Sequence, residues 1–143
     1  MTYFLDASAL VKRYVREPGS ERIQALVRRQ RQLVISRLTA VELPAAIWKR
    51  SRAGDLSATD ARRLLARFEG DLALLTTVEP RPPTIQLAAD LVERHPLRAY
   101  DAVQLASALR WARETRLATC FVCADRGLAG AAAKERLRQL TLA

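Results

Sequence analysis

The sequence predicts an α/β fold, in which a short parallel β-sheet of four or five strands is flanked by about seven helices as an α/β/α sandwich. Three observations predict it. Short apolar runs alternate along the chain with longer amphipathic stretches. Carboxylates directly follow two of these runs, at the expected ends of strands. The 143 residues include only five glycines and no low-complexity tract, so we expect a single domain, residues 1–143, that folds throughout.

The apolar runs define the expected strands. We expect strands at residues 2–5, 33–36, 73–78 and 119–124, and either an edge strand or a frayed tail at 137–142. Apolar runs of this length are typical of strands buried on both faces of a parallel sheet. Parallel strands need long crossover connections, which the intervening amphipathic stretches supply.

Those stretches predict the helices. Their expected bounds are about 8–15, 20–31, 39–52, 57–70, 84–94, 100–115 and 126–133. Ser20 is a plausible N-cap after the turn that contains Pro18 and Gly19. Residues 53–55 (Ala-Gly-Asp) separate two helices, and Pro96 requires the helix before it to stop.

The chain is strongly basic, with 24 Lys+Arg against 15 Asp+Glu and a formal net charge of +9. Only Lys12, Lys49 and Lys134 are lysines, and arginine binds phosphate bidentately. This charge favours nucleic acid as a partner, with an acidic protein or a membrane surface as alternatives. The sequence shows no export signal and no apolar run long enough to span a membrane, so we expect a cytoplasmic location.

Asp6 and Asp125 each follow an apolar strand directly. Ligands of α/β sheets bind outside the carboxyl ends of the strands, so both acids are candidate metal ligands. Ser8 lies close enough in sequence to Asp6 to hydrogen-bond a ligand or a water. Either acid could instead be only the N-cap of the helix that follows it.

Asp101 lies at the start of an expected helix, on the face that it shares with Leu105, Ala108 and Leu109. A carboxylate on an apolar face is costly to bury without a partner, so this position favours a bound cation. Capping of its own helix is the alternative.

Glu42 is more ambiguous. The segment from Thr39 to Glu42 fits a capping box, in which Glu42 would bond the Thr39 amide. Pro44 suggests that the regular helix starts later than Thr39, which weakens that interpretation. On local evidence the cap is favoured for Glu42. The acids at strand ends in a basic chain favour a divalent cation held against a phosphate-rich substrate, as in a metal-dependent nuclease.

Cys120 and Cys123 form a C-x-x-C pattern, which invites a redox or zinc interpretation. Residues three apart on a strand point to opposite faces, with Cα atoms roughly 10 Å apart, too far for a disulfide. The chain has no second cysteine pair, and His95 is its only histidine, so a zinc site is not expected. We expect two buried thiols.

Four segments point to a known family. They are residues 4–10 (FLDASAL), 36–42 (SRLTAVE), 97–106 (LRAYDAVQLA) and 121–128 (FVCADRGL). In this order and spacing they resemble the PIN-domain ribonucleases, in particular the VapC-like toxins of type II toxin–antitoxin modules. The resemblance spans essentially the whole chain, and it implies a PIN-like fold.

The resemblance also implies a site and partners. Asp6, Glu42, Asp101 and Asp125 would form an acidic quartet that holds Mg²⁺ or Mn²⁺, with a metal-activated water hydrolysing RNA. A homodimer, a single-stranded or structured RNA substrate and a cognate antitoxin protein that blocks the site are implied as well. Cys123 departs from the family pattern, because many relatives carry Thr or Ser two residues before the last acid.

Rival interpretations differ in chemistry. A metal-independent ribonuclease usually needs an acid and a base, often histidines, and His95 is alone. A haloacid-dehalogenase-like phosphatase would carry a second Asp two residues after Asp6, where this chain has Ser8. A catalytically inactive PIN-like module that binds RNA or a partner stays open as the alternative to an enzyme.

Overall fold

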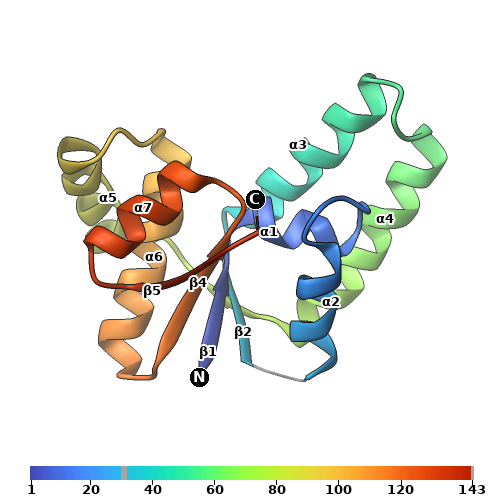
Figure 1. The fold of residues 1–143 in the computed structure, drawn as a ribbon. Helices are drawn as coiled ribbons and strands as arrows, with labels where there is room; N and C mark the ends of the chain where they lie inside the picture. Colours follow the sequence, from blue (N-terminus) through green and yellow to red (C-terminus); the bar gives the residue numbers. More distant parts are fainter. Residues whose placement is uncertain (30–31, 143) are drawn as a thin grey trace.

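Five short strands form one parallel sheet in the order β3-β2-β1-β4-β5 (Figure 1). The computed structural model describes residues 1–29 and 32–142. The strands are β1 (Thr2–Leu5), β2 (Gln32–Ser36), β3 (Thr76–Val78), β4 (Thr119–Cys123) and β5 (Arg138–Thr141). All four pairings are parallel, as predicted. Residues 137–142 include an edge strand, because β5 pairs with β4 in the register Cys120↔Arg138.

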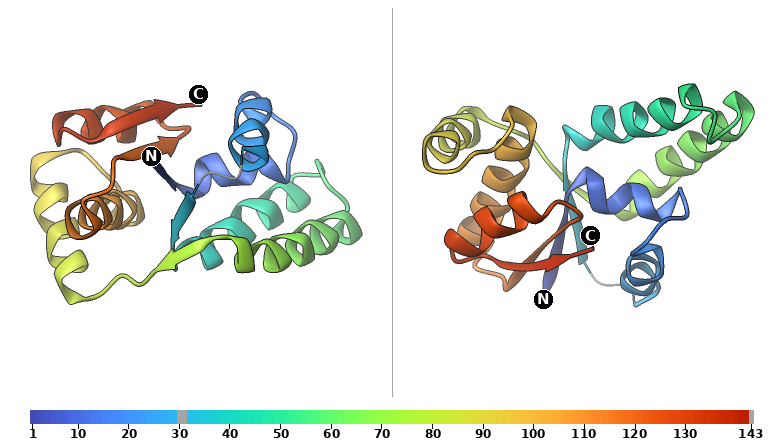
Figure 2. Two further views of the ribbon diagram at one scale, coloured as in Figure 1. Left: turned by 90° about the horizontal axis from the view of Figure 1, so that it is seen from below. Right: turned by 45° about the horizontal axis from the view of Figure 1, so that its top comes forward.

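Helices cover both faces of the sheet, which confirms the predicted α/β/α sandwich. The described residues form α1 (Ala7–Leu10), α2 (Ser20–Arg28), α3 (Thr39–Arg52), α4 (Ala58–Asp71), α5 (Pro82–Arg94), α6 (Ala99–Thr115) and α7 (Arg126–Lys134). Helices α5, α6 and α7 lie against one face, and α1 to α4 lie on the other side (Figures 1 and 2). The α3–α4 pair extends beyond the sheet like an arm (Figure 1).

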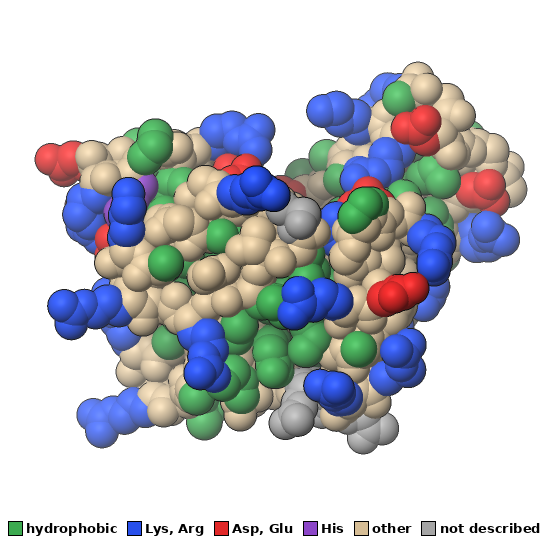
Figure 3. All heavy atoms as spheres, viewed as in Figure 1, with side chains coloured by type: hydrophobic (Ala, Val, Ile, Leu, Met, Phe, Trp, Pro, Cys, Tyr) green, Lys and Arg blue, Asp and Glu red, His purple; other side chains and the backbone are tan. Residues whose placement is uncertain are grey.

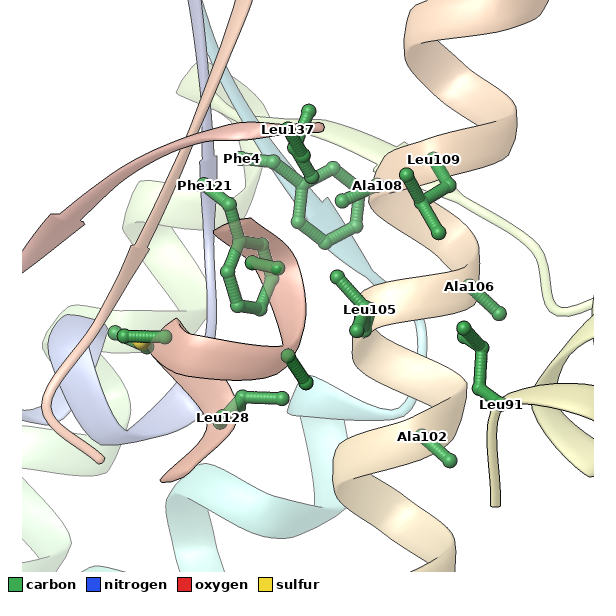
Figure 4. Close-up of a cluster of buried hydrophobic side chains, with 14 of the residues drawn as sticks. Phe4, Leu91, Ala102, Leu105, Ala106, Ala108, Leu109, Phe121, Leu128 and Leu137 are labelled. Carbon is green, nitrogen blue, oxygen red and sulfur yellow. The ribbon is translucent and has the colours of Figure 1, made fainter. Parts of the chain in front are cut away.

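The strands alternate their side chains between two hydrophobic cores. Phe4 and Phe121 stack with ring centroids 6.2 Å apart in the core beneath α5, α6 and α7. Leu5 and Val122, the next residues along, belong to the core on the opposite face. Figure 4 shows the two phenylalanine rings facing Leu105 of α6. This alternation determines which residues of each strand face each helical layer.

The two cysteines follow the same alternation. Cys120 lies in the core beside α1 to α4, and Cys123 lies in the core beside α5 to α7. Both are buried free thiols, as predicted.

Two expectations about the first helices are wrong. The helix expected at 8–15 is only one α-helical turn, α1, followed by a 3-10 turn at Val11–Arg13. Gly19, not Ser20, is the N-cap of α2, with φ of +95°, and the Ser20 hydroxyl accepts a bond from the Glu17 amide instead. A Cβ at Gly19 would lie 3.0 Å from Leu142, so this close approach requires glycine. The predicted helix end near Arg31 lies outside the described residues.

Other boundaries shift because of local chemistry. The strand expected at 73–78 shortens to β3, since Leu72–Leu74 forms a 3-10 turn. Helix α5 starts at Pro82, two residues early, because prolines suit a first helical turn that needs no amide donors. Helix α3 begins at Thr39, as the expected bounds have it, and it contains Pro44, so the later start that Pro44 suggested is not observed. Within the described residues, no helix is long and apolar enough to cross a membrane.

Candidate metal centre

Asp6 occupies the turn between β1 and α1, at the carboxyl edge of the sheet. Its amide donates to the Val122 carbonyl of β4 at 2.9 Å, which continues the β1–β4 ladder by one residue. Its Oδ2 accepts bonds from the Ser8 amide at 3.1 Å and from the Ser8 hydroxyl, so it caps α1. The side chain is only 3% exposed, and within the described residues its Oδ1 has no hydrogen-bond partner. A buried carboxylate oxygen without a donor is the atom that a cation would satisfy.

The electrostatics of Asp6 place other acids near it. Burial raises the pKa of Asp6 to about 6, while the two bonds from Ser8 lower it. The negative charges of Asp101 and Asp125 raise it further. Two carboxylates, one from the first turn of α6 and one after the end of β4, therefore lie within electrostatic reach of Asp6.

Ser8 links two strand ends. Its hydroxyl donates to Asp6 Oδ2 and accepts a bond from the Ala124 amide at 3.0 Å. Ala124 directly precedes Asp125, so the same hydroxyl positions both acids. Both of these bonds are to protein groups, and the expected bond from Ser8 to a ligand or a water stays a prediction.

Glu42 lies in the first turn of α3 and is half-buried. Its Oε1 accepts a bond from Gln104 Nε2 at 2.7 Å, and Gln104 also donates to the Thr39 hydroxyl at 3.0 Å. Burial raises the pKa of Glu42 to about 7; the bond from Gln104 lowers it, and the charges of Asp6 and Asp101 raise it.

The capping-box interpretation of Glu42 is wrong. Leu38 is the N-cap of α3 and makes no side-chain cap, while the Ser36 hydroxyl accepts from the Leu38 amide at 3.1 Å. Glu42 is thus directed across to α6 and does not return to its own helix.

Asp101 lies in the first turn of α6, with its side chain 17% exposed. Arg98 Nε lies 3.3 Å from its Oδ2. Leu105, Ala108 and Leu109 are buried, so the helix places Asp101 on its core-facing side, as the spacing predicted.

Asp125 is the N-cap of α7, with its Oδ1 accepting from the Leu128 amide at 2.8 Å. Asp125 therefore caps α7 through Oδ1, and its Oδ2 is the oxygen that could bind a ligand. The Cys123 thiol contacts the Asp125 carbonyl, with its sulfur 3.4 Å from that oxygen. Burial raises the pKa of Cys123 to about 12, so the thiol stays neutral, and it does not replace a hydroxyl beside the carboxylate.

The charges of Asp101, Asp125 and Glu42 thus all act on or with that of Asp6 at the carboxyl edge of the sheet. In Figure 3, acidic side chains lie in the notch between the two lobes, with basic side chains on either side of it. As the side chains stand, no group of three or more His, Cys, Asp or Glu residues in the described ranges is gathered around one ion position. The donor types nevertheless fit a hard divalent cation, since all are carboxylate oxygens and one of them is a buried oxygen without a donor.

Sequence reasoning missed Gln104 and Arg98. Gln104 is fully buried, its Oε1 has no hydrogen-bond partner among the described residues, and its Nε2 holds Glu42. It lies three residues after Asp101, hence on the same helix face, and a polar residue within an otherwise apolar face was the available signal. Arg98, the N-cap of α6, pairs with Asp101 and lowers the pKa of Glu42.

A cavity of about 390 Å³ lies away from the acids, between α1, α2 and the end of α4. Its charged groups satisfy one another, because Asp71 accepts from Arg13 Nε at 2.9 Å and from the Tyr14 hydroxyl at 2.7 Å. The acidic edge, with its unsatisfied oxygens, is therefore the stronger candidate for chemistry.

Comparison with known proteins adds independent findings. Residues 3–137 match the model of the PIN domain family. Two curated proteins of Mycobacterium tuberculosis, Ribonuclease VapC45 and Ribonuclease VapC49, are each 37% identical over 109 residues, which is 76% of this chain and 75% of theirs.

Solved structures share the fold. PAE2754 from Pyrobaculum aerophilum has a TM-score of 0.63 and 28% identity, over 92% of this chain and 79% of that one. FitAcB from Neisseria gonorrhoeae has a TM-score of 0.69 and 19% identity, over 97% and 96%. VapBC2 from Rickettsia felis, bound to a DNA fragment from their promoter, has a TM-score of 0.66 and 14% identity, over 99% and 98%.

Proposed function

Because this chain belongs to the PIN domain family, we propose that it is a metal-dependent endoribonuclease that acts as the toxin of a toxin–antitoxin pair. The observation that carries the proposal is the buried Asp6: one of its oxygens has no hydrogen-bond partner among the described residues, and the charges of Asp101, Asp125 and Glu42 interact with its own. We propose RNA as the substrate because two curated relatives, each 37% identical, are named as ribonucleases.

Asp6, Glu42, Asp101 and Asp125 would hold the cation, Mg²⁺ or Mn²⁺. When bound, such an ion neutralises phosphate charge and makes a water more acidic, so that this water can attack the phosphorus in line. Ser8 keeps Asp6 and the Ala124 amide in place, and Gln104 keeps Glu42 directed to the shared edge. Arg98, whose side chain is 84% exposed, can contact the RNA backbone beside Asp101.

The basic charge of the chain supports a polyanionic substrate. The net charge is +9, and Arg126, exposed in the first turn of α7, follows Asp125 directly. A cation at a helix N-terminus opposes the helix dipole, so it does not serve the stability of α7. Arg126 could instead contact an RNA phosphate. RNA binding should then weaken as the salt concentration increases.

The proposal is tested by RNA cleavage in Mg²⁺ or Mn²⁺, with and without chelator, for the wild type and Asp101→Asn. We expect chelator to abolish cleavage and Asp101→Asn to reduce it by at least about 100-fold, as for loss of a group that stabilises developing charge. The matched control is Asp90→Asn, since Asp90 on α5 pairs with Gln86 on the helix surface. Cleavage that resists chelator, or full activity of Asp101→Asn, contradicts the metal mechanism. Salt-sensitive RNA binding without any cleavage favours the inactive binding module.

The partners are part of the same proposal. Solved structures with this fold include complexes, among them VapBC from Salmonella typhimurium bound to DNA and a toxin–antitoxin complex from Klebsiella pneumoniae. We propose a cognate antitoxin that covers the acidic edge, a homodimer and a cytoplasmic location. Light scattering of the purified chain tests the dimer, and growth arrest on expression, relieved by the product of an adjacent gene, tests the toxin role.

A further inference from the structure

Tyr100 is an exposed aromatic side chain beside the acidic edge. It is the second residue of α6, and 64% of its surface is exposed, whereas the next residue, Asp101, is largely covered. Among the large apolar side chains that the described part of the chain leaves exposed, Tyr100 is the only aromatic one. No hydrogen bond or ring contact within the described residues involves it. Neither core packing nor hydrogen bonding explains an aromatic residue at this position.

The helix places Tyr100 toward the candidate site. It precedes Gln104 by four residues, so the two side chains lie one above the other on the same side of α6. Gln104 reaches across to Glu42 of α3, so Tyr100 projects one turn farther out on that side, at the rim of the acidic edge. Arg98, two residues before Tyr100, adds an exposed guanidinium to the same rim.

An exposed ring and an exposed guanidinium next to a group of carboxylates suit one kind of ligand. The guanidinium contacts a phosphate, while the ring offers a flat apolar face on which a base stacks. We propose that Tyr100 stacks on an unpaired base adjacent to the phosphodiester held at the acidic edge. The base must be unpaired for its face to reach the ring. This inference rests on the proposed function for the identity of the nucleic acid.

Double-stranded RNA is the alternative substrate, and base pairing prevents it from using Tyr100. In an A-form duplex each base is stacked between its neighbours, so a side chain at the surface cannot reach a base face. Single strands, loops and bulges leave that face free. A duplex could still contact the arginines, but it would gain nothing from Tyr100.

The test uses a short RNA with 2-aminopurine at one position, moved along the strand from one oligonucleotide to the next. Stacking on an aromatic ring quenches its fluorescence. Binding is measured in the presence of chelator, so that cleavage does not contribute. The variants are Tyr100→Ala and Tyr100→Phe. The matched control is Leu117→Ala, because Leu117 is 44% exposed in the loop between α6 and β4, at the opposite edge of the sheet.

We expect quenching at one position with the wild type, Tyr100→Phe and Leu117→Ala, and no quenching with Tyr100→Ala. The affinity of Tyr100→Ala for single-stranded RNA should fall about 5- to 100-fold, the range for loss of one stacked base. Its affinity for a fully paired RNA should change less than about twofold, by the same reasoning. Thermal unfolding should be unchanged, because Tyr100 is outside both cores.

The inference is overturned by unchanged quenching with Tyr100→Ala, or by an equal loss of affinity for single-stranded and paired RNA. Loss of dimerisation in Tyr100→Ala, without loss of quenching, would assign the ring to a subunit interface and also overturn it. Failure of the proposed function is a separate outcome. A chain that never cleaves RNA but shows Tyr100-dependent quenching retains the stacking role and loses the nuclease.

Discussion

Asp6 combines a folding cost with a chemical use. Its burial raises the pKa to about 6, above the value of 3.8 for a free side chain, so the neutral acid is the form that the fold favours. The charged form, needed to bind a cation, is disfavoured in the metal-free protein. Ser8 reduces this cost with two hydrogen bonds to one oxygen, and the other oxygen stays without a partner in the described part of the chain.

The first prediction at this scale is that Asp6→Asn stabilises the metal-free protein at pH 8. Because the pKa of Asp6 is raised in the folded protein, ionisation of Asp6 lowers the free energy of unfolding as the pH rises from about 4 to about 6. Above that range this loss of stability is complete. The two-unit shift corresponds to roughly 3 kcal/mol as an upper bound. Chemical unfolding at pH 8 and pH 4 measures it, and the gain should vanish at pH 4.

Asp90→Asn provides the comparison, since Asp90 is bonded only at the helix surface. If Asp6→Asn proves equal to the wild type or weaker at pH 8, then burial of the Asp6 charge does not oppose folding, and the case for a cation partner loses its main physical argument.

Gln104 acts through Glu42, as a positioning residue. Its bond to Glu42 lowers a pKa that burial has raised to about 7. In Gln104→Met, a buried side chain of similar size has no donor, so the pKa of Glu42 should rise further. We expect RNA cleavage at neutral pH to fall by about tenfold, as for other residues that orient metal ligands, and to recover in part at higher pH.

The pH profile of cleavage measures this, with Ser107→Ala as the control. Ser107 is a buried polar residue of the same helix, but its hydroxyl donates to the Val103 carbonyl within α6. A uniform loss of activity at every pH would mean that Gln104 serves packing alone.

At the scale of elements, the acids depend on four helix starts, those of α1, α3, α6 and α7. α1 and α7 begin where β1 and β4 end, and α3 is tied to α6 through Gln104. α7 is fixed at its other end as well: Glu135, at its C-cap, accepts bonds from Arg94 and lies 2.6 Å from His95 Nε2. The bonds from Arg94 and His95 hold the pKa of Glu135 below its usual value, although burial opposes them.

Glu135→Gln should therefore destabilise the fold at pH 7 by about 1–3 kcal/mol, as for loss of charge-assisted hydrogen bonds. Because the folded pKa is lowered, the contribution is present above the unfolded pKa of about 4.5 and is lost as the pH falls through the folded pKa. Thermal unfolding at pH 7 and pH 3 measures it. Equal destabilisation at both pH values would point to steric repacking as the cause.

At the scale of the whole molecule, the sequence predicted the layers well and the site contacts poorly. The short apolar strands, and their alternation with amphipathic helices along the chain, are local patterns. The five-stranded sheet and its two helical layers follow from them. The Gly19 cap was missed because it depends on close approach to Leu142, far away in sequence. Gln104 was missed because its partner, Glu42, is 62 residues away.

The central claim is that the acidic edge binds a divalent cation for RNA hydrolysis, and calorimetric titration of Mn²⁺ into the wild type and Asp6→Asn tests it most directly. The same preparations are assayed for RNA cleavage at each Mn²⁺ concentration. We predict saturable binding to the wild type, cleavage that rises with occupancy, and at least a tenfold loss of Mn²⁺ affinity in Asp6→Asn, as for removal of a metal ligand. Equal Mn²⁺ binding by the two proteins, or cleavage that does not follow occupancy, would contradict it.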